Sequence, residues 1–400
     1  MVSSSIFAIF LCNYAAKMLS QKHLFQLPCE GHYLNCAYMS PLLKSVEAAG
    51  IAGIQKKRNP ADIRQEDFFA EAEIVRVKFG QLINGDPAQV AIIPSASYGL
   101  QSAISNIPPS SGTHAITVSE EFPSDFYSLK NWCTRHRKDL VVIPSPETGP
   151  EKGKNWNERL LEAINPDTAA VVISSLHWTN GMLFDLEKIG ARCKAVGALF
   201  IVDGTQSVGA MPIDVAAFQI DALVCAAYKW LLGPYSIGLA WYSEVFNDGI
   251  PIEESWLNRT NADNFAGLTN YTADYKPGAA RYQVGEYSNF ILLPMVHAAL
   301  DQILAWQVAD IEQYCRQLTA PLMDFLIKNE FGLESESYRA GHLFGFSLPP
   351  SLDRSNLLAA LQQNNIFVSL RSSSIRVSPH VYNSEEDIRA LMGVLEESGR

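Results

Sequence analysis

Three absences limit what this 400-residue chain can do. It has no excess of basic residues, because 31 Lys and Arg stand against 42 Asp and Glu, a formal net charge of -11. A chain of that sign is repelled by phosphate backbones, so we expect no nucleic-acid partner. It also has no internal repeat and no low-complexity tract, and 48% hydrophobic with 18% charged residues is typical of a folded protein.

Paired cysteines are also missing. The seven cysteines, at positions 12, 29, 36, 133, 193, 225 and 315, are odd in number and include no CxxC pair. We interpret them as free thiols of a reducing compartment, which predicts a cytoplasmic protein without a metal site.

The sequence lacks an apolar run long enough for a membrane span. The run Ile6–Cys12 is too short to cross a bilayer, and no basic residue precedes it as a signal peptide would require. We therefore expect no membrane partner. Residues 1–17 are treated as an apolar extension of open status, with Met18 as a candidate start.

Strand-like and helix-like patterns alternate along most of the chain. Such alternation predicts an α/β fold with a mostly parallel, seven-stranded sheet covered on both faces. The expected strands are Val90–Ile93, Ala115–Val118, Leu140–Ile143, Ala169–Ile173, Leu199–Val202, Ala222–Ala226 and Gly238–Tyr242, and the expected helices include Pro60–Leu82 and Leu186–Val196.

The C-terminal part has its own pattern, after a Gly-rich polar break at Pro277–Asn289. It predicts a small α+β domain, so the chain divides into a large domain and a smaller one. Its expected elements are a long helical stretch Leu293–Asn329, strands His342–Ser347, Ile366–Leu370 and Ser374–Val377, and helices Asn356–Asn364 and Glu385–Glu397.

Lys229 lies where a buried strand runs out into a loop. The apolar run Ala222–Ala227 ends in Tyr228-Lys229-Trp230, and Gly233-Pro234 breaks the chain soon after. An ammonium group there is costly unless it is paired or neutral, and lysines so placed often have lowered pKa values and form Schiff bases. The alternative is a lysine whose amine reaches solvent beside Trp230.

Asp203 ends the neighbouring apolar strand. A polar turn, Gly204–Gly209, follows it, so the acid and Lys229 occupy the carboxyl ends of two strands of one parallel pattern. Ligands of open α/β sheets bind at that edge. An amine that forms an imine with an aldehyde, and a carboxylate that pairs with a pyridinium nitrogen, are what pyridoxal phosphate requires.

The segments VDGTQSVGAMPIDV and DALVCAAYKWLLGPYSIG resemble the class V aminotransferase family of pyridoxal-phosphate enzymes. That family includes cysteine desulfurases, kynureninase and isopenicillin N epimerase-like proteins. The resemblance runs from about Tyr33 to the C-terminus. It implies an aminotransferase-type large domain at 46–289, a small C-terminal domain at 290–400, a segment 18–45 that contributes to the active-site mouth and the small domain, and a homodimer.

Ser95-Ala96-Ser97 follows a strand and precedes a helix-like run. Helix N-terminal N–H groups and a hydroxyl bind anions. The family has a Gly-Ala-Thr-like triplet here, which implies that the Ala96 N–H and the Ser97 hydroxyl hold the cofactor phosphate beside Ser95. A simple N-cap serine is the alternative.

The resemblance also implies contacts to the cofactor ring. Phe122 takes the place where desulfurases have a stacking His and kynureninase has Phe, with a core Phe as the alternative. Asn180 and Gln206 are the candidate donors to the phenolic oxygen. His177 is a candidate proton relay or Asp203 partner.

The chain departs from the family pattern around the phosphate. Tyr228 replaces the His of many relatives, as in kynureninase-like members, where the Tyr reaches the phosphate. Ala226 replaces a phosphate-binding Ser. The family's cross-subunit "GTPN" segment reads GEYSN here, which leaves Tyr287 or Ser288 as the candidate contact from a partner subunit.

Two residues are implied to bind an amino-acid substrate. Arg376 matches the family's carboxylate-binding Arg, with Arg371 as a spare, and a surface salt bridge is the alternative. Asn35 matches the Asn of a "YLNNAA" segment that helps to hold the same carboxylate, unless it is a turn residue.

The reaction is left open among several classes. Ser372-Ser373-Ser374 stands where desulfurases carry a nucleophilic Cys, which argues against a persulfide mechanism. Transamination, epimerisation and C–S lysis at the α-carbon remain, each beginning with proton removal by Lys229. A kynureninase-like hydrolase, suggested by Phe122 and Tyr228, and a catalytically silent scaffold are the alternatives.

Overall fold

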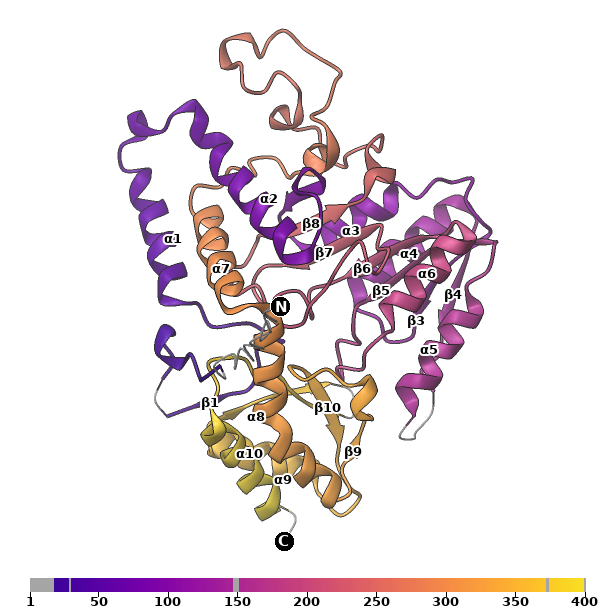
Figure 1. Ribbon diagram of the computed structural model, residues 1–400, viewed down its shortest axis with the longest axis vertical. Coiled ribbons are helices and arrows are strands. Elements are labelled where there is room, and N and C mark those ends of the chain that lie inside the picture. The colour runs from indigo at the N-terminus through magenta and orange to yellow at the C-terminus, as the bar shows by residue number, and fades with distance from the viewer. Residues whose placement is uncertain (1–17, 29, 147–150, 372–373, 399–400) are drawn as a thin grey trace, which may run out of the picture.

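The computed structural model describes residues 18–28, 30–146, 151–371 and 374–398 (Figure 1). The apolar extension 1–17, Cys12, Cys29 and Ser372-Ser373 therefore lie outside the described residues. Within the described ranges, no helix combines the length and the apolar character that a bilayer crossing demands.

A seven-stranded sheet forms the centre of the large domain. Its strand order is β2-β8-β7-β6-β5-β3-β4, and every neighbouring pair is parallel except the two pairs that involve β8. The predicted fold class is confirmed. The strands are β2 (Val90–Ile93), β3 (His114–Val118), β4 (Asp139–Ile143), β5 (Thr168–Ser174), β6 (Leu199–Asp203), β7 (Ala222–Ala226) and β8 (Gly238–Tyr242).

Helices cover both faces of this sheet because alternate residues of each strand point to opposite sides. On β7, Ala222 and Val224 pack into one apolar cluster, while Leu223 and Cys225 pack into the other. The first face is covered by α3 (Ala96–Ser105) and α4 (Pro123–His136), and the second by α2 (Ala70–Ile83), α5 (Lys152–Ala163), α6 (Leu186–Val196) and α7 (Leu292–Trp306), with α1 (Lys44–Lys56) outside α7.

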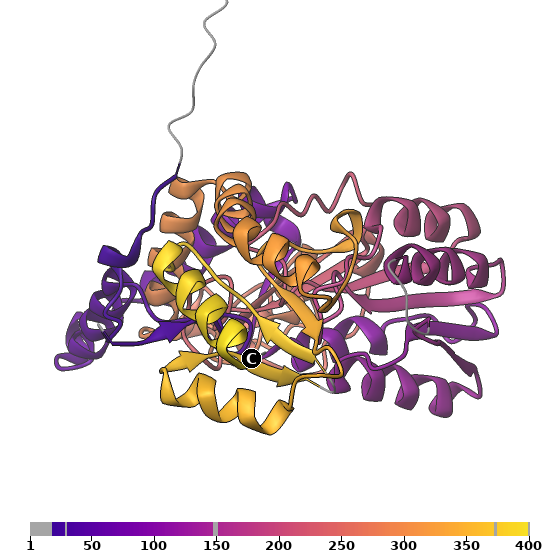
Figure 2. The same cartoon turned by 90° about the horizontal axis from the view of Figure 1, so that it is seen from below.

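The small domain is built on an antiparallel sheet of order β12-β13-β10-β9. Figure 2 looks at the molecule from this side. Its elements are α8 (Val308–Lys328), β9 (Gly332–Leu333), β10 (Phe344–Ser347), α9 (Arg354–Gln363), β11 (Ile366–Phe367), β12 (Ser369–Arg371), β13 (Ser374–Val377) and α10 (Glu385–Ser398), and the N-terminal β1 (His32–Tyr33) pairs in parallel with β11.

Some predicted elements are divided in the structure. The long helical stretch 293–329 is two helices, because Gln307 between α7 and α8 has a φ of 65°, outside the helical region. The strand predicted at 366–370 is the two short strands β11 and β12. The helix predicted at 60–82 begins as 3-10 turns, and only α2 is α-helical.

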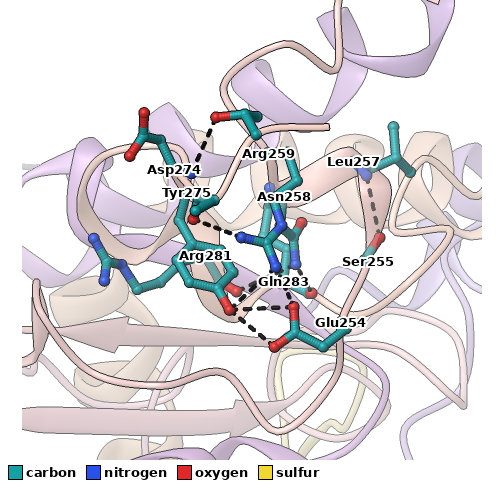
Figure 3. A network of polar contacts seen from close by, with 11 residues as sticks. Glu254, Ser255, Leu257, Asn258, Arg259, Asp274, Tyr275, Arg281 and Gln283 are labelled. Carbon is teal, nitrogen blue, oxygen red and sulfur yellow. Dashed lines mark hydrogen bonds and ion pairs between the residues drawn. The ribbon is translucent and has the colours of Figure 1, made fainter. Parts of the chain in front are cut away.

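The connection from β8 to α7 projects at the top of Figure 1 and is held by polar contacts (Figure 3). The Glu254 carboxylate accepts hydrogen bonds from Arg259 and from the Tyr275 hydroxyl, and the Arg259 guanidinium lies 4.0 Å from the Tyr275 ring centroid. Asn258 donates to the Gln283 carbonyl at 2.6 Å. These side chains order the segment in place of regular secondary structure.

Candidate active site

A cavity of about 330 Å³ opens at the carboxyl ends of β6 and β7. Asp203 is the last residue of β6, and Lys229 follows the end of β7, so the sheet brings the two together as predicted. The lining residues are Pro94, Ser95, Ala96, Ser97, Phe122, Ser124, Ser174, Trp178, Asp203, Thr205, Gln206, Ala226, Tyr228, Lys229, Tyr235, Ser236 and Ile237. They include every predicted cofactor-binding residue except Asn180.

Lys229 is buried, with only 6% of its surface exposed. Its Nζ lies 5.8 Å from the Phe122 ring centroid and 5.5 Å from that of Tyr228. Burial lowers the pKa of Lys229 to about 8, and the guanidinium groups of Arg376 and Arg371 act in the same direction against the attraction of Asp203. About one in ten of these amines is therefore neutral at pH 7, far more than for an exposed lysine.

Asp203 is buried beside this lysine. Its Oδ1 accepts a hydrogen bond from the Thr205 N–H at 2.8 Å, which fixes the carboxyl group at the start of the polar turn. Burial raises the pKa of Asp203 above its usual value, while Thr205 and Lys229 oppose that shift.

Two further buried acids stand near Asp203, and sequence reasoning missed both. Glu121 accepts hydrogen bonds from the Phe122 N–H at 2.7 Å and from the N–H and hydroxyl of Ser174 at 2.8 and 2.6 Å. Both carboxyl oxygens of Asp125 are buried and have no hydrogen-bond partner among the described residues. Burial raises the pKa of both acids, that of Glu121 to about 7.

The N-terminus of α3 faces the cavity. Ser95 is its N-cap and accepts from the Tyr98 N–H at 3.2 Å, and the Ser95 and Ser97 hydroxyls are 2.9 Å apart. The predicted N-cap alternative for Ser95 thus describes its present hydrogen bond. Ala226 offers no hydroxyl, but Thr205 and Ser236 line the same cavity.

Gln206 and Asn180 are held in different ways. Gln206 lines the cavity, yet its amide donates to the Ala37 carbonyl at 3.2 Å and accepts from the Trp230 indole at 2.9 Å. Asn180 accepts from the Met182 N–H at 3.1 Å inside a turn, and it does not line the cavity. The structure therefore does not bring Asn180 to the other predicted residues.

His177 is a buried neutral ring. Its Nε2 lies 3.3 Å from the Ser119 carbonyl and its Nδ1 2.7 Å from the Thr179 hydroxyl. Burial lowers the pKa of His177 to about 4. The ring is thus bound to the protein on both nitrogens and makes no hydrogen bond to Asp203.

The predicted substrate residues lie on the small-domain side of the site. The Arg376 Nη1 donates to the Trp178 carbonyl at 2.7 Å, while its Nε and Nη2 are buried without a partner among the described residues. Burial, with Arg371 adding to it, lowers the pKa of Arg376 to about 9. Asn35 is buried and accepts from the Ser369 hydroxyl at 2.7 Å.

Trp178 connects these residues with the cavity, and no sequence pattern pointed to this role. Its ring meets that of Phe122 edge-on at 5.6 Å, and its indole N–H donates to the Glu120 carbonyl at 2.8 Å. Neither Arg376 nor Asn35 lines the cavity itself. Trp178 is therefore the wall between the cavity and Arg376.

A family comparison decides the identity of this arrangement. The model of the family described as Aminotransferase class-V matches residues 56–391. The chain belongs to the class V aminotransferase family. Members of that family are pyridoxal-phosphate enzymes, so this protein is an enzyme whose cofactor is pyridoxal phosphate.

Individual relatives are distant and carry different activities. An uncharacterized aminotransferase, YcbU, of Bacillus subtilis is 25% identical and covers 81% of this chain and 83% of its own length. A kynureninase of Geobacillus thermodenitrificans is 23% identical, with coverage of 89% and 83%. A solved cysteine desulfurase of Thermococcus onnurineus has a TM-score of 0.77 at 20% identity, covering 96% of this chain and 98% of that one, which supports the fold alone.

The residues present fit this cofactor. The cavity joins a buried amine, the buried Asp203 carboxyl group and a helix N-terminus with two serine hydroxyls, which match an aldehyde, a pyridine nitrogen and a phosphate respectively. Two nitrogens of Arg376, which is bonded to the Trp178 carbonyl at the cavity wall, are also buried without partners among the described residues and are available to an anion. Those residues also contain no cluster of three or more His, Cys, Asp or Glu suited to a metal ion.

Proposed function

We propose that this class V enzyme acts at the α-carbon of an amino-acid substrate, with Lys229 as the residue that attaches the cofactor and moves the proton. The observation that carries the proposal is the burial of the Lys229 amine in the cavity beside Asp203, with its pKa lowered to about 8. A partly neutral amine can take up a proton near neutral pH, which a fully charged one cannot.

The cofactor contacts follow from the cavity. Asp203 would hold the pyridine nitrogen, Phe122 would pack on the ring, and the α3 N-terminus with Ser95, Ala96 and Ser97 would hold the phosphate. Tyr228 and Gln206 also line the cavity and would contact the bound cofactor. When bound, pyridoxal phosphate withdraws electrons from the α-carbon of an attached amino acid.

Arg376 is proposed to hold the substrate carboxylate. Its guanidinium is already fixed by the Trp178 carbonyl, and two of its nitrogens remain free for a carboxylate. A planar guanidinium suits this group because it can donate two parallel hydrogen bonds. Asn35 bridges Ser378, just after β13, and bonds to the Ser369 hydroxyl, so its contribution stays a prediction.

A persulfide desulfurase reaction is not proposed. Each cysteine within the described residues, namely Cys36, Cys133, Cys193, Cys225 and Cys315, is buried. Burial raises the pKa of the Cys315 thiol, the last in the chain, which disfavours the thiolate that would accept sulfur. Transamination, epimerisation and C–S lysis remain the proposed reaction classes.

A kynureninase-like hydrolase is the second candidate. The resemblance to kynureninase implies that Phe122 stacks on the cofactor ring and that Tyr228 reaches the phosphate. Both residues line the cavity, and a curated kynureninase matches most of the chain, which supports this candidate. Incubation of the purified enzyme with kynurenine decides this candidate, because release of anthranilate supports it and its absence excludes it.

The attachment of the cofactor is the first test. Borohydride treatment of the yellow enzyme followed by peptide mapping should place the cofactor on residue 229, and Lys229→Ala should remove both the adduct and turnover. A stable adduct on any other lysine would refute the assignment. A screen of amino-acid donors that scores keto acid, ammonia, sulfide and racemised product together then identifies the reaction class.

A further inference from the structure

The hairpin β12–β13 carries two arginines on one face. Ser369 pairs with Arg376 and Arg371 pairs with Ser374 in the antiparallel register. Directly paired residues share a face, and so do residues two apart on one strand, so Arg371 and Arg376 project from the same side as diagonal neighbours. Ser369, which lies between them on that face, bonds to Asn35.

Both guanidinium groups contact Trp178, a residue that lines the cavity. Arg376 donates to the Trp178 carbonyl, and the Arg371 guanidinium lies 5.8 Å from the Trp178 ring centroid. Trp178 itself lines the cavity next to Phe122 and Lys229. The two arginines therefore stand side by side at the substrate end of the site rather than at the phosphate end.

Neither arginine is neutralised within the described residues. Neither forms an ion pair there, and the Nε atoms of both, with Nη2 of Arg376, are buried without a hydrogen-bond partner. The charge of Arg371 also disfavours the charged forms of Arg376 and Lys229, so the three groups share one electrostatic environment. Adjacent cations of this kind are costly unless anions bind between or beside them.

Within the described residues, the partner of the Arg371 guanidinium is the uncharged Trp178 ring, which does not neutralise its charge. The one hydrogen bond of this guanidinium in the described part of the chain runs from Nη1 to the carbonyl of Leu370, the preceding residue, at 2.9 Å, and this bond connects no two elements. A single α-carboxylate satisfies Arg376, since one guanidinium and one carboxylate form a bidentate pair. Arg371 therefore requires a second anionic group, which the α-carboxylate does not provide.

We propose that Arg371 binds a second negatively charged group on the substrate, so that the preferred substrate is an amino acid with an acidic side chain. This inference rests on the proposed function of Arg376 as the α-carboxylate site. The expected substrate is a dianion, whose α-carboxylate binds Arg376 and whose side-chain oxyanion binds Arg371. Such a site rejects neutral side chains because Arg371 would stay unpaired in a partly buried setting.

Binding of unreactive acids to the cofactor-loaded enzyme tests this proposal without turnover. The dissociation constants of glutarate and of the monocarboxylate butyrate are measured by calorimetry for the wild type and for Arg371→Gln, Arg376→Gln and Arg389→Gln. Arg389 is a matched control because it removes the same charge from an exposed ion pair on α10. We expect glutarate to bind more tightly than butyrate, and Arg371→Gln to weaken glutarate roughly 10- to 100-fold while changing butyrate little.

The control outcomes separate this proposal from the one on which it rests. Arg376→Gln should weaken both acids, and Arg389→Gln should weaken neither. Equal binding of both acids to the wild type, or an equal loss for both in Arg371→Gln, would overturn the second anion site. Unchanged binding of both acids to Arg376→Gln would instead contradict the proposed function of Arg376, and the visible absorbance of the bound cofactor, recorded for each variant, verifies that every sample is cofactor-loaded.

Discussion

Four ionisable side chains, Lys229, Asp203, Glu121 and Asp125, share one buried region of this enzyme. Three are acids and one is a base, and burial shifts the pKa of each toward the value that favours its neutral form. Burial therefore favours protonated carboxyl groups on the three acids and a deprotonated amine on Lys229. Chemistry at this site depends on how a ligand redistributes those protons.

Asp203 is predicted to act through its charge rather than its shape. Asp203→Ala should weaken cofactor binding and lower turnover by orders of magnitude, because the pyridine nitrogen loses its anionic partner. Asp203→Asn retains an oxygen for the Thr205 N–H and should be almost as slow. Titration of each apo-variant with pyridoxal phosphate, followed by steady-state rates, checks both. Normal turnover of Asp203→Asn would show that the charge lies elsewhere.

The raised pKa of Glu121 predicts that the folding stability of the protein depends on pH. Its folded-state pKa is raised to about 7 from 4.5, so the folded protein keeps a proton that the unfolded chain has already lost. The stabilisation from this proton is fully present below about pH 4.5 and is lost as the pH rises through about 7. Glu121→Gln, which cannot ionise, should thus gain stability relative to the wild type across that window, by up to roughly 2 to 3 kcal/mol.

The measurement is denaturant unfolding of the apoprotein at pH 5, 6, 7 and 8. Glu120→Gln serves as the control, because Glu120 is exposed and adjacent. A difference between wild type and Glu121→Gln that stays constant across these pH values would contradict the assignment.

The turn after β5 shows how one element sets the geometry of the site. Gly181 has a φ of 73°, and a Cβ placed on it would lie 1.9 Å from the Leu343 carbonyl oxygen. This close approach seats the turn that carries Trp178 against the segment leading into β10. The wall of the cavity and the small sheet are therefore joined at a position that only glycine fits.

Gly181→Ala should lower the free energy of unfolding by at least about 2 kcal/mol and weaken carboxylate binding as Trp178 shifts. Gly393→Ala is the matched control, since no atom lies within 4 Å of its added Cβ and it sits inside α10. That variant should be neutral or more stable by up to about 1 kcal/mol. Equal stabilities of the two variants would disprove the tight fit at Gly181.

Sequence patterns predicted the sheet well and the loops poorly. The strands β2 to β8 are apolar runs with turn residues between them, so their positions and the meeting of Lys229 with Asp203 could be inferred. No Gly or Pro lies at or beside Gln307 to indicate a helix end, so the sequence pattern predicted one helix where the structure has α7 and α8. Asp125 occupies the first turn of α4, where acids usually cap helices, and only the structure reveals its burial.

At the scale of the whole molecule, exposed apolar side chains support the predicted homodimer. Ile51 and Ile54 lie three residues apart on α1 and are 50% and 58% exposed, and Ile74 and Val77 are exposed in the same spacing on α2. Both helices pack on α7 (Figure 1). Exposed apolar stripes of this kind are typical of subunit interfaces.

Ile54→Asp should therefore weaken the dimer, because a carboxylate would be buried without a partner. Light scattering after size-exclusion chromatography, over a range of concentrations, should show the monomer at concentrations where the wild type is dimeric. Val245→Asp is the control, as Val245 is 61% exposed and lies outside α1 and α2, directly after β8. A wild type that is monomeric throughout, or an Ile54→Asp dimer of unchanged affinity, would contradict this interface.

The two arginines and the buried lysine belong to different sheets, which are connected through Gln307 and the β1–β11 pair. A displacement of one sheet against the other thus lengthens or shortens the span between the amine and the guanidinium groups, and it must rearrange the few bonds that join the two parts, such as that from Arg376 to the Trp178 carbonyl. Evolution can consequently retune which chain length of substrate is accepted through replacements at the interdomain contact, far from any atom that touches the substrate.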